Sequence, residues 1–155
     1  MSLVAGQKFQ KVFYFAAGGA GSGESQSNPL SMAADNATVW DIPAFTLIEK
    51  VYCVLTTAVT GTTNFDIGDD DDADGYLDSS LSVTLATPGV YGWNAKVAGA
   101  YLRVETAGAT DPADIYVVPG SKFYTAAGKE LKMDLTTAAT AGALKIVVEG
   151  MYFGQ

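Results

Sequence analysis

The sequence predicts an all-β protein, built as a jelly-roll-like sandwich or a barrel. Stretches of alternating or β-branched residues recur at short intervals, and Gly- or Pro-containing turns separate them. No stretch has the 3.6-residue apolar period of an amphipathic helix. Many short strands joined by such turns are typical of sandwiches, jelly rolls and small barrels.

The predicted strands follow one another along most of the chain. In chain order they are residues 11–16, 36–42, 45–59, 64–67, 81–85, 101–106, 115–118, 129–135 and 143–153. Residues 129–135 alternate most clearly, because Leu131, Met133 and Leu135 share one side-chain row and charged residues fill the other. That pattern predicts a strand with one buried face.

Residues 45–59 form the longest predicted strand. Past Lys50 both of its side-chain rows are largely apolar, which predicts a central strand covered on both faces. Gly61 and Thr62 then suit a type II′ hairpin turn to a short return strand at residues 64–67. Cys53 is the only cysteine, so an intrachain disulfide is excluded, and we expect it to be a small buried apolar side chain.

Composition narrows the function classes. A chain of 155 residues fits one domain with a sizeable core. It contains no histidine, which removes the usual general base and the Ser-His-Asp and Cys-His arrangements, and we expect no enzymatic activity. Carboxylate pairs of the glycosidase type remain an open alternative, although no spacing identifies one.

The net charge of -8 repels phosphate backbones, so we expect no nucleic-acid partner. No apolar run has the length of a membrane span, and the N-terminal residues do not have the pattern of a secretory signal. Asn and Gln are sparse, which is compatible with a heat-adapted source.

Two parts are predicted along the chain. Residues 1–29 are expected to be an N-terminal arm, with a strand and a Gly/Ser-rich tether, and residues 30–155 the β-sandwich or jelly-roll body. The arm residues expected to contact a partner are the apolar and cationic ones, namely Leu3, Val4, Lys8, Phe9 and Lys11. An ordinary edge strand followed by a long loop is the alternative.

A run of aspartates resembles the first half of a calcium-binding loop. Asp70, Asp72 and Asp74 take positions one, three and five, Gly75 takes position six and Asp78 position nine. Position twelve is leucine instead of the bidentate glutamate, and no helices flank the run, so an EF-hand is excluded. A weak calcium site on these four aspartates and a solvated acidic turn both remain open. No other cofactor is expected.

Tyr91 and Trp93 lie next to glycines in a turn-rich passage. Such aromatic residues suit a sugar-stacking platform, but more often they cap the core or line a subunit contact. Together with the aspartate run they favour, as one alternative, a calcium-dependent carbohydrate-binding module.

Four segments resemble small structural proteins of tailed bacteriophages. They are residues 55–63 (LTTAVTGTT), 65–69 (FDIGD), 72–77 (DADGYL) and 141–149 (AGALKIVVE). In size and pattern the chain is most similar to the capsid decoration (cement) proteins of siphoviruses from thermophilic hosts. The resemblance implies an all-β homotrimer that binds the major capsid protein on the outer capsid surface through extended arms.

The sequence therefore favours a non-enzymatic virion protein that binds the outside of a phage capsid and stabilises it. A phage tail or fibre protein is the near alternative, because the segments are typical of phage structural proteins in general. Neither alternative requires a membrane, a nucleic acid or a catalytic group.

Overall fold

The computed structural model describes residues 5–33, 37–62, 65–78, 85–92, 101, 104–105, 115–116 and 121–154. None of these residues lies in a helix. The strands are β1 (Gln7–Ala16), β2 (Leu30–Ser31), β3 (Ala37–Ile42), β4 (Thr46–Thr60), β5 (Phe65–Gly68), β6 (Gly89–Tyr91), β7 (Val104–Glu105), β8 (Ile115–Tyr116), β9 (Lys122–Tyr124), β10 (Lys129–Leu135) and β11 (Ala141–Tyr152).

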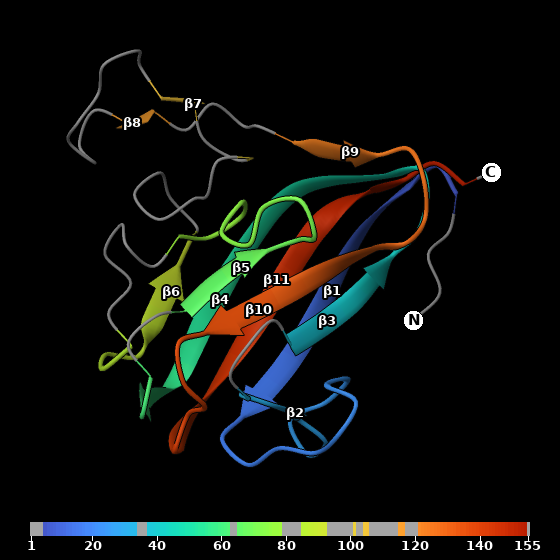
Figure 1. Cartoon of the computed structure of the whole chain (residues 1–155). Helices are drawn as coiled ribbons and strands as arrows, with labels where there is room; N and C mark the ends of the chain where they lie inside the picture. The colour runs from blue at the N-terminus through green and yellow to red at the C-terminus, as the bar shows by residue number, and fades with distance from the viewer. Residues whose placement is uncertain are drawn as a thin grey trace.

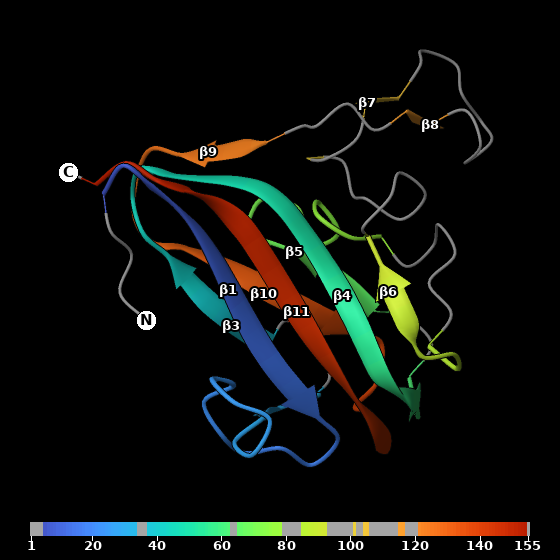
Figure 2. The ribbon, with the colours of Figure 1, turned by 180° about the vertical axis from the view of Figure 1, so that it is seen from behind.

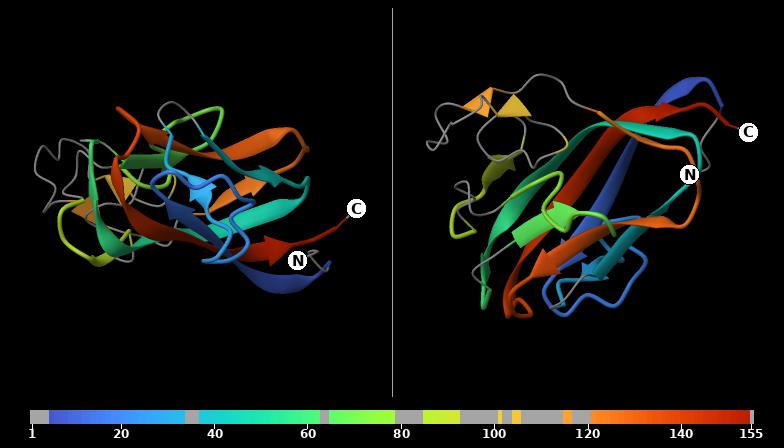
Figure 3. Two further views of the ribbon diagram at one scale, coloured as in Figure 1. Left: turned by 90° about the horizontal axis from the view of Figure 1, so that it is seen from below. Right: turned by 45° about the horizontal axis from the view of Figure 1, so that its top comes forward.

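Two sheets face each other as the layers of a sandwich (Figure 1). The larger sheet has six strands in the order β2-β1-β11-β4-β6, and β9 also pairs with β4. The smaller sheet has the order β3-β10-β5, and β7 pairs with β8 separately. Figure 3 shows the two layers from below, and the described strands do not close into a barrel. The all-β prediction is confirmed.

The core lies between the two sheets. Alternation along each strand sends every second side chain inward, so the two layers contribute facing apolar rows. The larger sheet contributes Phe13, Phe15, Ile48, Val51, Cys53, Leu55, Leu144, Ile146 and Val148. The smaller sheet contributes Val39, Ile42, Phe65, Ile67, Leu131, Met133 and Leu135. Cys53 is 1% exposed, and burial raises the pKa of its thiol, as expected for a small buried side chain.

Strand β4 is central, as predicted, because β11 pairs with one side of it and β6 and β9 with the other. The prediction that both faces of β4 are covered is correct for one face only. The inward row is buried, whereas Leu47, Tyr52 and Val54 on the outward row are partly exposed. Figure 2 shows this outer face with no described segment across it.

The predicted hairpin after β4 is wrong. Gly61 does have a positive φ of 93°, but β5 pairs with β10 in the smaller sheet and not with β4. Phe65 and Ile67 are fully buried, so β5 gains more by adding its apolar row to the second layer than by extending the first.

Residues 7–16, expected within an extended arm, instead form β1. All ten pair with residues 143–152 of β11, and Phe9 packs edge-to-face on Trp40 with 5.7 Å between ring centroids. The glycine-rich stretch that follows is a folded loop, in which Gly21 and Gly23 donate backbone hydrogen bonds to Pro29 and Asn28. The residues before Gln10 include few large apolar side chains. The strand is nevertheless held in the sheet, because Phe9, Phe13 and Phe15 pack on or in the core and the backbone pairs with β11.

Candidate functional site

The acidic loop, residues 69–75, leaves β5 and turns around one buried carboxylate. The Asp69 side chain is fully buried. Its Oδ1 accepts hydrogen bonds from the backbone N–H groups of Asp71 and Asp72, at 2.9 and 3.1 Å. The same loop is closed by backbone bonds from Asp69 N–H and Gly75 N–H to the carbonyl of Asp72. One side chain therefore fixes the path of its own loop, as aspartate does in tight turns.

The Asp69 carboxylate also joins the loop to distant strands. Its Oδ2 accepts from Lys122 Nζ and from Tyr124 Oη, both at 2.5 Å, and its Oδ1 accepts from Tyr101 Oη at 2.8 Å. Burial raises the pKa of Tyr124, so this hydroxyl stays protonated and donates to Asp69. Tyr76 Oη lies 2.7 Å from Tyr124 Oη and donates to it, since the single proton of Tyr124 is already used.

Electrostatics favour the ionised form of Asp69. Burial by itself raises the pKa of this carboxyl, but the hydrogen bonds from Lys122, Tyr124 and Tyr101 outweigh it and hold the pKa below its usual value. The ammonium of Lys122 also lies 3.8 Å from the ring centre of Tyr101, a cation–π contact. Asp69 and Lys122 thus form an ion pair in which the carboxylate is fully buried and the lysine side chain is 19% exposed.

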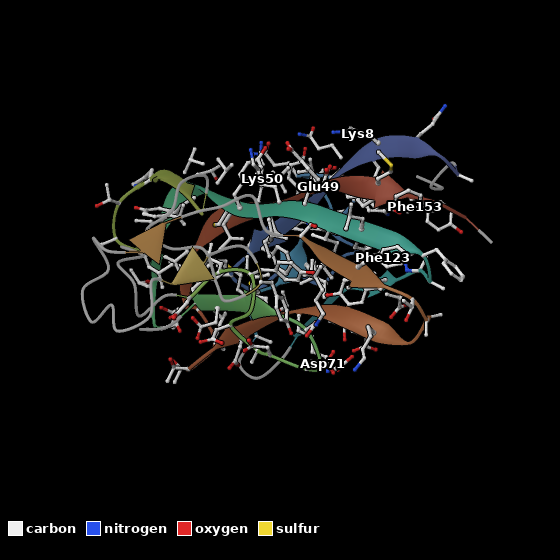
Figure 4. The ribbon with its side chains drawn as sticks, turned by 90° about the horizontal axis from the view of Figure 1, so that it is seen from above. Lys8, Glu49, Lys50, Asp71, Phe123 and Phe153 are labelled. Atoms are coloured by element: carbon white, nitrogen blue, oxygen red, sulfur yellow. The ribbon has the colours of Figure 1, made fainter. Side chains whose placement is uncertain are left out.

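Lysines also neutralise the outer carboxylates of the loop. Asp70 pairs with Lys132 at 2.5 Å, while Asp71 pairs with Lys129 and, at 3.2 Å, with Lys122. Figure 4 shows Asp71 on the side of the smaller sheet, opposite Lys8 and Lys50 on the larger one. The aspartates therefore do not simply repel one another, because strands β9 and β10 bring three cations to them.

The four aspartates of the suggested calcium site are only partly brought together. Asp70 is directed to Lys132, whereas Asp74 is hydrogen-bonded to Asp72 and lies within electrostatic range of Asp78. Among the residues that the structure describes, no group of three or more acidic, cysteine or histidine side chains has the arrangement of a metal site.

The contact between Asp74 and Asp72 predicts that the stability of the fold changes between pH 7 and pH 5. The hydrogen bond and charge of Asp72, together with burial, raise the pKa of Asp74 to about 6. The folded state therefore takes up a proton near pH 6 that the unfolded chain binds only near pH 4, so stability rises as the pH falls from 7 towards 5. We expect the melting temperature to rise by about 2–4 °C, the effect of ~1 kcal/mol after solvent screening.

Asp74→Asn should raise the melting temperature at pH 7 and flatten its dependence between pH 5 and 7. Asp41→Asn, at an exposed position on β3, is the matched control and should leave the slope as in the wild type. Thermal melts at pH 7, 6 and 5 measure this. The raised pKa of Asp74 would be contradicted if the melting temperature of the wild type fell from pH 7 to pH 5 and that of Asp74→Asn fell by the same amount.

The aromatic end, formed by Phe45, Phe123 and Phe153, lies where β4 begins and β11 ends. The rings of Phe123 and Phe153 meet edge-to-face at 5.8 Å, and Phe153 N–H donates to the carbonyl of Phe45. The three side chains are 36–48% exposed. Figure 4 shows Phe123 and Phe153 together at this end of the sandwich. No sequence pattern joined these residues, because they belong to three separate segments.

The remaining predicted site residues are scattered. Lys8, Phe9 and Lys11 lie on β1, and Leu3 and Val4 lie outside the described residues. Tyr91 ends β6, packs against the core and donates its hydroxyl to the carbonyl of Thr87, while Trp93 lies outside the described residues. The sugar-platform interpretation gains no support from Tyr91.

Comparisons of the chain with protein-family models, with curated proteins and with solved structures find no match. The described residues include no helix that is long and apolar enough to cross a membrane.

Proposed function

We propose that this protein is a structural virion protein that binds the outside of a tailed-phage capsid and stabilises it, without catalysis. The resemblance to decoration proteins supports the proposal, and its segments lie in β4, in β5, in and just after the acidic loop, and in β11. The proposal includes the properties implied by that resemblance: a jelly-roll body, a homotrimer and the major capsid protein as partner.

The observation that carries the proposal is the aromatic end. Phe45 has φ = 58°, a left-handed backbone conformation that is unfavourable for a bulky residue. The strained residue is not part of the buried core, since it is 36% exposed, and its backbone carbonyl accepts a hydrogen bond from Phe153, another exposed phenylalanine. Clustered, half-exposed aromatic side chains are typical of protein contact sites. We assign this surface to contact with the capsid shell.

A small contact surface such as the aromatic end is sufficient for binding to a capsid. A capsid offers many identical sites, so several copies joined in one oligomer bind far more tightly than a single copy. A net charge of -8 keeps decorated particles apart in solution.

The test is binding of purified protein to undecorated, expanded capsids. Wild-type protein is expected to bind them and to raise their disruption temperature. The double variant Phe123→Ala/Phe153→Ala should bind at least about 30-fold more weakly, a loss of ~2 kcal/mol at a contact hot spot. Val90→Ala is the matched control, because Val90 is also exposed but lies on β6.

If wild-type protein neither binds the capsids nor raises their disruption temperature, the decoration role is wrong. Microscopy of labelled virions separates the near alternative, since a tail or fibre protein would be found on the tail. Equal binding by the double variant and Val90→Ala would remove the aromatic end from the contact.

A further inference from the structure

Among the described residues, the outer edge of β1 has backbone groups without a strand partner. Ala17 N–H donates to the carbonyl of Gly142, towards β11, whereas Tyr14 N–H donates to the carbonyl of Gly23, on the opposite side. Because the direction alternates along an antiparallel strand, the backbone groups of Lys8, Gln10 and Val12 also point away from β11. In the described chain β2 pairs only with Phe15 and Ala16, so the edge from residue 8 to 12 is open.

A groove runs beside this edge. Its volume is about 560 Å³. It is lined by Gln10, Lys11, Val12, Phe13 and Tyr14 of β1, by Ser22 and Glu24 of the following loop, and by Trp40 of β3. The groove is therefore bordered by β1 of the larger sheet and β3 of the smaller sheet, and Figure 2 shows these two strands on the same side of the sandwich. An extended chain placed there would meet both hydrogen-bonding groups and aromatic surface.

Lys11 gives the groove a charge preference. Its ammonium lies 5.1 Å from the ring centre of Trp40 and 5.8 Å from that of Phe13. Burial lowers the pKa of Lys11, and the charge of Glu24 offsets only part of this effect. No ion pair of Lys11 occurs within the described ranges, whereas Lys122, Lys129 and Lys132 each have a carboxylate partner. A partly desolvated cation of this kind is complementary to a carboxylate.

We propose that the edge of β1 accepts an extended, acidic segment of a partner protein. The segment adds to the larger sheet as a further strand through the backbone groups of Lys8, Gln10 and Val12, and its side chains alternate. One acidic side chain reaches Lys11, and an apolar neighbour packs against Trp40. The residues expected to form an arm that pairs with a neighbour instead form the edge that receives one.

A lysine directed inward on an edge strand also discourages edge-to-edge pairing. The two roles differ in one respect: a purely protective lysine rejects every strand, whereas the proposed site prefers an acidic one. The inference does not depend on the proposed capsid role, since it concerns the chemistry of the segment and not its source.

The probes are three capped seven-residue peptides of alternating threonine and valine. One has glutamate at its centre, one has lysine there, and one has glutamate with alternate backbone nitrogens methylated. Amide and indole resonances of the full chain, titrated with each peptide, report binding. The glutamate peptide should shift Lys8, Gln10, Val12 and Trp40 and should bind at least about ten-fold more tightly than the lysine peptide. The methylated peptide should not bind.

Two variants of the protein complete the test. Lys11→Gln should retain binding but reduce the preference for glutamate to less than about two-fold. Val12→Pro should remove binding while preserving the fold, because the Val12 N–H faces away from the β1–β11 ladder and proline is tolerated at such edge positions.

Three results would overturn the inference. They are equal affinity for the glutamate and lysine peptides, no shift along β1 with any peptide, and edge resonances that move with protein concentration alone. The last would mean that a second copy of the chain occupies the edge.

Discussion

Asp69→Ala is expected to lower the free energy of unfolding by about 3–5 kcal/mol, the loss typical of removing one partner from a buried ion pair. The Asp69 side chain is fully buried, so the substitution leaves the hydroxyls of Tyr101 and Tyr124 without their acceptor and removes the carboxylate nearest to Lys122. It also removes the acceptor for two backbone N–H groups of the acidic loop. Chemical denaturation at pH 7 measures the change.

Asp71→Ala is the matched control. Asp71 contacts two lysines but its side chain is 50% exposed, so solvent already screens its charge and a much smaller loss is expected. Asp69→Asn should fall between the two, because it keeps the shape and loses the charge. Equal losses in Asp69→Ala and Asp71→Ala would mean that burial of the ion pair contributes nothing.

Gly68→Ala should destabilise the protein by about 2–4 kcal/mol, because the added methyl group has no space. A Cβ at Gly68 would lie 2.0 Å from the carbonyl oxygen of Asp72 and 2.4 Å from that of Ala73. Both contacts are with backbone, so the acidic loop must move away from β5 as a unit. Hydrogen exchange should then become faster in residues 69–78 before the rest of the chain is affected.

Gly89→Ala is the control for this substitution. The three atoms nearest to a Cβ at Gly89 belong to the Tyr91 ring and hydroxyl, at 3.6–3.7 Å, which is ordinary contact. Its unfolding free energy should change by less than about 1 kcal/mol. The prediction is wrong if Gly68→Ala is as stable as Gly89→Ala and hydrogen exchange in the acidic loop is unchanged. The close approach of Gly68 to the Asp72 carbonyl would then not be needed for stability.

The alternation of apolar and polar residues along the sequence was enough to predict most of the strands. Side chains alternate along a strand whatever its partner is, so Leu131, Met133 and Leu135 identified the buried face of β10 locally. The apolar rows of β4 likewise predicted a central strand. Prediction from pattern missed the short strands β2, β6 and β9, which are two or three residues long and depend on the strands beside them.

The acidic loop was only half predictable. Aspartates and Gly75 indicated a turn, but the charge balance came from lysines on β9 and β10 that are 51–62 residues away in the chain. Repulsion within the run therefore suggested a cation, whereas the fold supplies ammonium groups. The aromatic end is a similar case, because Phe45, Phe123 and Phe153 become neighbours only through the pairing of β4 with β9 and β11.

The sequence by itself determined that this chain is all-β, which face of β10 is buried, and that Cys53 is buried. Only the tertiary structure decided which strands pair. It joined β5 to β10 instead of β4, and it made residues 7–16 a strand of the larger sheet instead of an arm. Hydrogen-bonding groups of a strand are the same for every partner, so the choice depends on which apolar rows can be buried together across the sandwich.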